Sequence, residues 1–176
     1  MMPRPPLTGP LILVARPEPR AQAALDALRA AHWPPPGPRL PAHVTLFRQL
    51  PPSQEADLLA RLRMEARDLR AAQAQPMGWS ERNAGIALRL ACPALDALHA
   101  RLAGAWAPLM GAADRGTPWL HVTIAHGLDP RAVRALARRL AGEPPPPRLA
   151  LVALELWRWR PAGPLELAGR VALRPA

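Results

Sequence analysis

The sequence predicts an α+β protein made of two similar halves, each a strand–helix–strand–helix–strand unit, related by an approximate two-fold axis. Four amphipathic helical segments alternate with apolar, strand-like segments along the 176 residues. The order of these segments occurs twice, at about residues 10–82 and 84–174. Each half also contains a histidine–valine–threonine tripeptide at a corresponding place. We therefore expect residues 1–176 to form a single two-lobed domain.

The helices are predicted from apolar residues at helical spacing. The predicted helical ranges are 19–31, 53–71, 93–107 and 130–141. In the last of these, Asp129 is the expected N-cap, Pro130 occupies the first turn and Gly142 ends the helix. Ser53 is the expected N-cap of the second.

Strands are predicted where apolar runs or alternating patterns lie between turn residues. The predicted strands are Leu11–Arg16, His43–Leu50, Gln75–Arg82, Ala84–Ala91, Leu120–His126, Leu149–Trp159 and Leu165–Leu173. Proline-rich segments at 34–38 and 144–147 indicate stiff connectors that are too short to separate domains. No glycine-rich loop follows a strand, which argues against a doubly wound nucleotide-binding sheet.

Composition indicates a compartment and a kind of partner. Apolar residues make up 49% of the chain, enough for a substantial core, and the single cysteine, Cys92, excludes an intrachain disulfide and a cysteine-rich zinc site. We find neither a signal sequence nor an apolar run of membrane-spanning length, so we expect a cytoplasmic protein without a membrane partner. All 23 basic residues are arginine, against 13 acidic ones, and this charge of +10 permits polyanionic partners without proving them.

The two matching tetrapeptides are the strongest functional signal. They read His43-Val44-Thr45-Leu46 and His121-Val122-Thr123-Ile124 in a chain with only five histidines and four threonines. Chance placement of two such histidine–threonine pairs has a probability of roughly half a percent. Residues two apart on a strand share a face and lie about 6.5 Å apart. We therefore expect two imidazoles and two hydroxyls to face one cleft.

Such a group of side chains suits a phosphate ester. One neutral histidine can accept a proton from the attacking water or hydroxyl, and the other, protonated, can donate one to the leaving oxygen. The two threonine hydroxyls can bind phosphate oxygens and orient phosphorus. This chemistry requires neither a metal nor a cofactor.

The paired motifs resemble the His-x-Thr-x signatures of the 2H phosphoesterases, in particular the 2′-5′ RNA ligase or RNA 2′,3′-cyclic phosphodiesterase group. The resemblance implies a V-shaped cleft between two sheets and the opening of a 2′,3′-cyclic phosphate to a 2′-phosphomonoester. It further implies that His121 is the base, His43 the acid, and Thr45 and Thr123 the phosphate-binding residues. The implied partner is RNA with a 2′,3′-cyclic phosphate end or a small cyclic nucleotide. We expect a monomer.

Two alternatives remain open at this stage: 2′-5′ ligation by the reverse reaction, and a basic RNA- or nucleotide-binding module without turnover. Four residues near the motifs are also of interest. Phe47 shares the motif face in strict alternation, so it is a possible substrate contact, although core packing is the more common role of such a residue. Arg115 and Trp119 precede the second motif and are possible contacts too. Arg48 is expected to face away from His43.

The direction in which His126 points shows whether the strand that carries the second motif is regular. Strict alternation places His121, Thr123 and Ala125 on one face and His126 on the other. We therefore expect His126 to point away from the cleft or to lie where the strand ends. Trp157 and Trp159 alternate with arginines, a pattern that fits either base stacking or a sheet strand with a solvated arginine edge.

Overall fold

The computed structural model describes residues 9–161 and 163–176, and it has the α+β composition that the sequence predicts. In chain order the elements are β1 (Leu11–Pro17), α1 (Pro19–His32), β2 (Val44–Leu50), α2 (Glu55–Ala66), β3 (Ala72–Glu81), β4 (Ile86–Ala91), α3 (Pro93–Trp106), β5 (His121–Ala125), α4 (Pro130–Ala141), β6 (Leu149–Arg158) and β7 (Glu166–Ala172). Short 3-10 turns occur at Pro52–Gln54, Ala107–Leu109 and Ala112–Asp114. Every predicted helix and strand is thus present.

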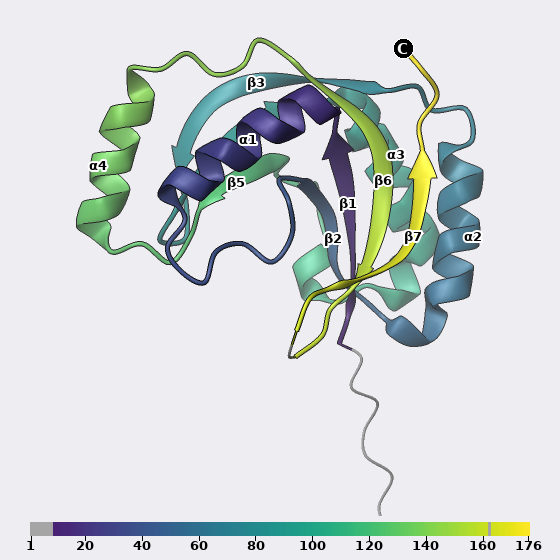
Figure 1. Ribbon diagram of the computed structural model, residues 1–176. Helices are drawn as coiled ribbons and strands as arrows, with labels where there is room; N and C mark the ends of the chain where they lie inside the picture. The colour runs from purple at the N-terminus through teal and green to yellow at the C-terminus, as the bar shows by residue number, and fades with distance from the viewer. Residues whose placement is uncertain (1–8, 162) are drawn as a thin grey trace, which may run out of the picture.

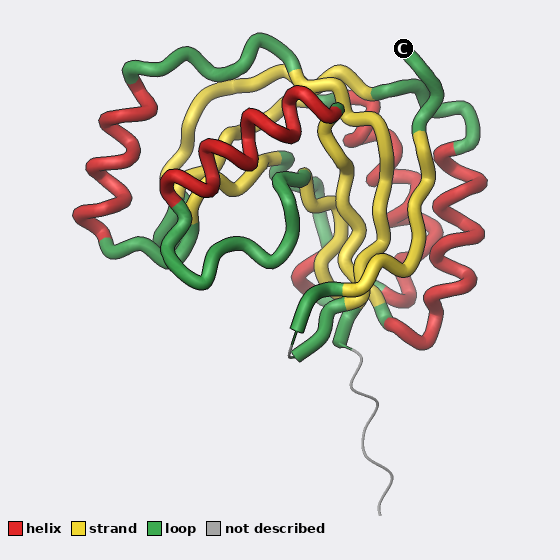
Figure 2. Tube along the Cα trace, in the orientation of Figure 1, coloured by secondary structure: helices red, strands yellow, loops and turns green. Residues whose placement is uncertain are grey.

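The strands form one curled antiparallel path in the order β2-β1-β6-β3-β4-β5. Strand β7 lies off this path and pairs with β6. The two expected sheets are joined through β3, whose residues 72–74 pair with β6 while residues 75–81 pair with β4. Figure 2 shows this path as an arch. Because the arch curls, the motif strands β2 and β5, which stand at opposite ends of the path, approach each other.

Helices α2, α3 and α4 flank the arch, whereas α1 runs beneath β3 in Figure 1. Helices α2 and α3 pack against each other beside β7, whereas α4 packs on β3 and β4, as Figure 1 shows. Helix α1, from the first half of the chain, contacts β5 from the second. The main core lies between the sheet and the pair α2–α3, and a smaller cluster lies under α4.

Two helix ends test the capping predictions. The Asp129 carboxylate accepts hydrogen bonds from the Arg131 and Ala132 amides, at 2.8 and 2.9 Å, which confirms it as the N-cap of α4. Ser53 is not a helix cap, because it lies inside a 3-10 turn and α2 begins only at Glu55. Helix α2 also ends at Ala66, earlier than predicted. Among the described residues, no helix has the length and apolar character needed to cross a membrane.

Candidate active site

The two motifs meet at a single pocket of about 400 Å³. His43 immediately precedes β2 and Thr45 lies within it, while His121 and Thr123 lie on β5. All four side chains line this pocket and all four are half-buried. The intervening Val44, like its counterpart in β5, is fully buried on the opposite face. Alternation within each tripeptide is therefore as the sequence predicts.

Each motif histidine is held by the same main-chain contact. The Nδ1 atom of His43 lies 2.7 Å from the Pro41 carbonyl oxygen, and that of His121 lies 2.6 Å from the Trp119 carbonyl oxygen. A carbonyl oxygen only accepts hydrogen bonds, so Nδ1 must carry the proton and donate it. In both rings Nε2 is therefore the nitrogen available for proton transfer.

The environment favours an uncharged ring at both positions. Burial lowers the pKa of His43 to about 4; the bond to the Pro41 carbonyl opposes the shift, and the positive charges of Arg29 and Arg16 add to it. Burial also lowers the pKa of His121, and Arg48 and Arg82 lower it further. At neutral pH both imidazoles are therefore uncharged in the ligand-free protein. An anionic phosphate bound between them would favour protonation of one ring.

Strand β2 departs from regular alternation directly after its threonine. Thr45 and Phe47 pair with adjacent residues of β1, so Leu46 is an extra residue that forms a β-bulge. Beyond the bulge the faces exchange. Phe47 is fully buried, stacked on His99 at 4.4 Å, whereas Arg48 is exposed and lines the pocket. Phe47 therefore packs in the core, the alternative to a substrate contact that its sequence position allowed. The expectation that Arg48 faces away from the cleft is wrong, because the bulge turns its side chain toward the pocket.

Strand β5 contains a bulge at the equivalent place. Thr123 and Ala125 pair with adjacent residues of β4, which makes Ile124 the extra residue. Ala125 is consequently buried, and His126, just past the end of β5, is exposed and lines a neighbouring pocket of about 260 Å³ with His121 and Thr123. The expected strand end is confirmed, but His126 does not point away from the cleft. It is the positional counterpart of Arg48, five residues after the motif histidine.

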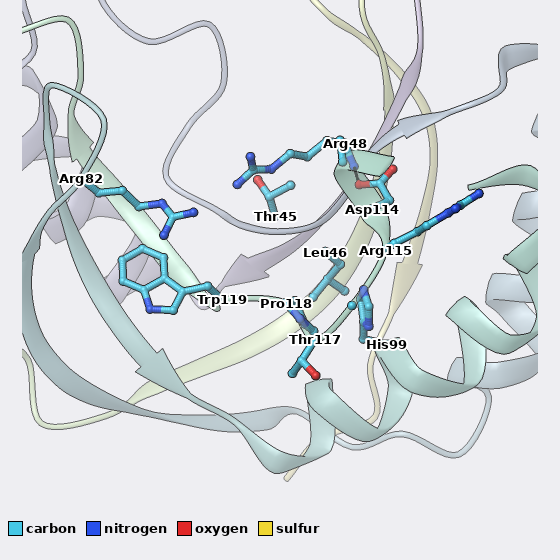
Figure 3. A pocket seen from close by; sticks show the side chains of 12 residues that line it. Thr45, Leu46, Arg48, Arg82, His99, Asp114, Arg115, Thr117, Pro118 and Trp119 are labelled. Carbon is cyan, nitrogen blue, oxygen red and sulfur yellow. Dashed lines mark hydrogen bonds between the residues drawn. The ribbon is translucent and has the colours of Figure 1, made fainter. Parts of the chain in front are cut away.

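A third pocket, of about 180 Å³, adjoins the motif pocket and shares Thr45 with it. Arg48 and Arg82 lie on its wall, and in Figure 3 their side chains extend toward each other. Trp119 lines the same pocket, with the Arg82 guanidinium 4.5 Å from its ring centre, and its contact with a substrate stays a prediction. Arg115 lines the rim, but Figure 3 shows its side chain extending away from Thr45.

The motif pocket also has two aromatic walls, only one of which was considered from the sequence alone. Trp33 follows α1 and Trp159 follows β6, and both line the pocket. Each has a guanidinium near its ring: Arg29 lies 4.9 Å from the Trp33 ring centre, and Arg39 lies 5.3 Å from that of Trp159. The position of Trp159 on the pocket is compatible with base stacking, which stays one of the two alternatives for this tryptophan. Arg82 and Trp33, which lie next to a turn and a proline-rich connector, were not identified from the sequence.

The described part of the chain contains no cluster of three or more histidine, cysteine, aspartate or glutamate side chains arranged to hold a metal ion. The groups that face the pocket are instead imidazoles, hydroxyls and guanidiniums. Together they can donate and accept protons and bind an anion, which is the chemistry expected at a phosphate ester.

A curled antiparallel sheet that carries paired histidine–threonine motifs around one pocket defines the protein as a 2H phosphoesterase. The chain belongs to the 2′-5′ RNA ligase superfamily, whose sequence model matches residues 17–163. No protein with a curated description matches the sequence.

Solved structures show the same fold. E. coli LigT in apo form superposes with a TM-score of 0.58 at 16% identity, covering 95% of this chain and 98% of that one. LigT complexed with 3′-AMP gives 0.57 at 17% identity, with 95% and 99% covered. A structure described as a phosphoesterase gives 0.59 at 16% identity over the same shares of the two chains.

Proposed function

We propose that this protein is a metal-independent phosphodiesterase that opens 2′,3′-cyclic phosphates of RNA ends or nucleotides to 2′-phosphomonoesters. Membership of the superfamily supports phosphoester chemistry in general. The observation that carries the proposal is that both histidine–threonine pairs line one pocket, with each Nδ1 engaged by a carbonyl and each Nε2 available.

The proposed reaction is a single displacement at phosphorus. Water attacks phosphorus in line with the bond to O3′, and His121 Nε2 accepts the proton of the water. The P–O3′ bond breaks as His43, protonated at Nε2 when the phosphate anion is bound, donates that proton to O3′. The Thr45 and Thr123 hydroxyls donate hydrogen bonds to the non-bridging oxygens. The product keeps its phosphate on O2′, and the two rings exchange protons with solvent before the next turnover.

Ligation would use the same displacement with a ribose hydroxyl in place of water as the nucleophile, and it is the reverse of the cleavage of a 2′-5′ bond. Water is present at about 55 M, so hydrolysis dominates unless a second RNA end is held in the cleft with a comparable effective concentration. Hydrolysis is therefore the direction that we propose.

The test is turnover of the four nucleoside 2′,3′-cyclic monophosphates and of a short RNA with a cyclic end, each with and without EDTA. Phosphorus NMR should show the 2′-phosphomonoester as product, formed at the same rate when EDTA is present. Loss of activity in EDTA with recovery on adding a divalent ion would contradict the proposal. Binding of these compounds without any turnover would identify a binding module instead.

A further inference from the structure

Two arginines at the cleft lack a protein counter-ion. Ion pairs among the described residues engage arginines elsewhere, such as Arg16 and Arg170 with Glu155, but none of them includes Arg48 or Arg82. Arg48 lines all three pockets around the motifs, and Arg82 lines the two that flank the motif pocket. Both lie near enough to the His121 ring to lower its pKa.

Arg48 is held in this place by its backbone. The Asp114 carboxylate, buried beneath the loop before the second motif, accepts hydrogen bonds from the Arg48 amide at 2.7 Å and the Gln49 amide at 2.8 Å. The pairing of β2 with β1 is irregular over this stretch, and Asp114 thus satisfies amides at an irregular part of the ladder. Together with the bulge at Leu46, this contact fixes the point at which the Arg48 side chain enters the cleft.

Arg82 is held by different means. It begins the turn between β3 and β4, where its amide donates to the Gly85 carbonyl oxygen at 2.9 Å. Its guanidinium lies over the Trp119 ring, a cation–π contact that orients the side chain without neutralising it. Both arginines are therefore cations held at the cleft without an acidic partner among the described residues, which leaves their charge available to an anionic ligand.

The motif residues already supply the groups for one phosphate: two hydroxyls and two imidazoles. In a nucleoside 2′,3′-cyclic phosphate that phosphate occupies O2′ and O3′, which leaves O5′ as the ribose oxygen that can carry another. We propose that Arg48 and Arg82 bind this second phosphate, on the 5′ side of the reacting nucleotide. The inference rests on the proposed function, because it places the cyclic phosphate at the motif residues, and it narrows the substrate to cyclic phosphates that bear a 5′ phosphate.

This 5′ phosphate has two sources with the same chemistry. In an RNA end it is the phosphodiester that links the last nucleotide to the one before it. In a nucleoside 5′-phosphate 2′,3′-cyclic phosphate it is a terminal phosphate. A guanidinium binds either through paired N–H donors. Assays with one substrate of each kind distinguish the two sources.

The binding test compares adenosine 2′,5′-bisphosphate with adenosine 2′-monophosphate by calorimetry, and it needs no turnover. The wild-type protein should bind the bisphosphate about tenfold or more tightly, and Arg48→Ala or Arg82→Ala should bring the ratio close to one. Arg138→Ala is the matched control, because it removes one exposed arginine from α4, away from these pockets. Equal wild-type affinities, or a ratio that survives both cleft variants, would overturn the inference.

The turnover test measures kcat and KM for a cyclic mononucleotide, its 5′-phosphorylated form and a dinucleotide with a cyclic end. Either cleft variant should raise KM by about tenfold or more for the two substrates with a 5′ phosphate relative to its effect on the cyclic mononucleotide. The rates are compared at the pH optimum of each variant, because both arginines lower the pKa of His121. A fall in kcat for all three would instead place the arginines at the reacting phosphate and refute a second site. A dinucleotide preference without one for the 5′-phosphorylated mononucleotide assigns the site to RNA ends.

Failure of the proposed function gives a different result from failure of this inference. If no cyclic phosphate is hydrolysed, the proposed function fails, and the calorimetric ratio still tests the arginine site. If the cyclic mononucleotide is hydrolysed as fast as its 5′-phosphorylated form, the proposed function stands and the second phosphate site does not.

Discussion

The contact from each motif histidine to a carbonyl two residues earlier determines what that ring can do. It places the proton on Nδ1 in both rings and leaves Nε2 for the substrate. His43→Ala and His121→Ala should therefore each lower kcat by about 10²-fold or more, because each removes the proposed general acid or base. The double variant should lose much less than the product of the two effects, because the rings act as a unit. Steady-state rates on a cyclic mononucleotide measure all three.

His126 provides the comparison within the same strand. It lines the neighbouring pocket but has no role in the proposed proton transfers. His126→Ala should change kcat by less than about tenfold. If it were as damaging as His121→Ala in a protein with an unchanged circular dichroism spectrum, the assignment of the base would be wrong.

The depressed histidine pKa values predict the pH dependence. The proposed mechanism requires one neutral and one protonated ring, so the rate should follow a bell-shaped curve with limbs that belong to the coupled pair. Both pKa values lie below 6.5 in the free protein, that of His43 at about 4. The maximum of kcat/KM should therefore fall below pH 6.5.

The bound phosphate changes this balance. Its negative charge raises the pKa of both rings, so the maximum of kcat should lie at higher pH than that of kcat/KM. Rate profiles from pH 4 to pH 9 measure both quantities. A rate that rises steadily from pH 5 to pH 9 would indicate a base other than a histidine.

At the scale of an element, the turn between β3 and β4 controls the position of Arg82. Ala84 has a φ of +56°, and a β-carbon on Gly85 would lie 2.1 Å from the Ala125 carbonyl oxygen. Gly85→Ala should thus destabilise the protein by about 1–3 kcal/mol, because β5, the strand that carries His121, would have to move. Ala84→Gly should be neutral or stabilising by up to about 1 kcal/mol, since it removes a left-handed alanine. Urea unfolding measures the free energy of unfolding of both variants. An equal change in that free energy for the two variants would contradict these predictions.

Elements were predictable where local pattern decides them. The apolar stripe and capping residues of α4 predicted both of its ends, whereas α2 ends at Ala66 although Leu69 continues the apolar stripe. The four motif residues were predictable because alternation holds between each histidine and its threonine. It fails one residue later, at Leu46 and Ile124, where no glycine or proline marks a bulge. The pairing with the neighbouring strands sets these bulges. For this reason the sequence alone could not predict which way Phe47, Arg48 and His126 face.

At the scale of the whole molecule, the net charge of +10 and the lack of acidic residues on the pocket walls other than Asp114 favour anions. An RNA end carries more phosphates than a cyclic mononucleotide, so KM for the RNA should rise more steeply with salt. KM is measured for both substrates between 50 and 200 mM salt, a range over which contacts to phosphate weaken strongly. The slopes of KM against salt for the RNA and for the mononucleotide are then compared. Equal slopes would show that the protein contacts only the terminal nucleotide.

The central place of β6 in the arch has a consequence for how the chain acquires its structure. This strand comes late in the sequence, yet it pairs with β1 on one side and with β3 on the other, so that Leu11 lies opposite Arg158. Until β6 has been synthesised, the parts of the sheet that carry the two motifs have no strand to join them. Folding must therefore wait for contacts between distant residues, which slows it. We therefore expect a ribosome-bound nascent chain that still lacks β6 to contain both motif sequences without an assembled cleft.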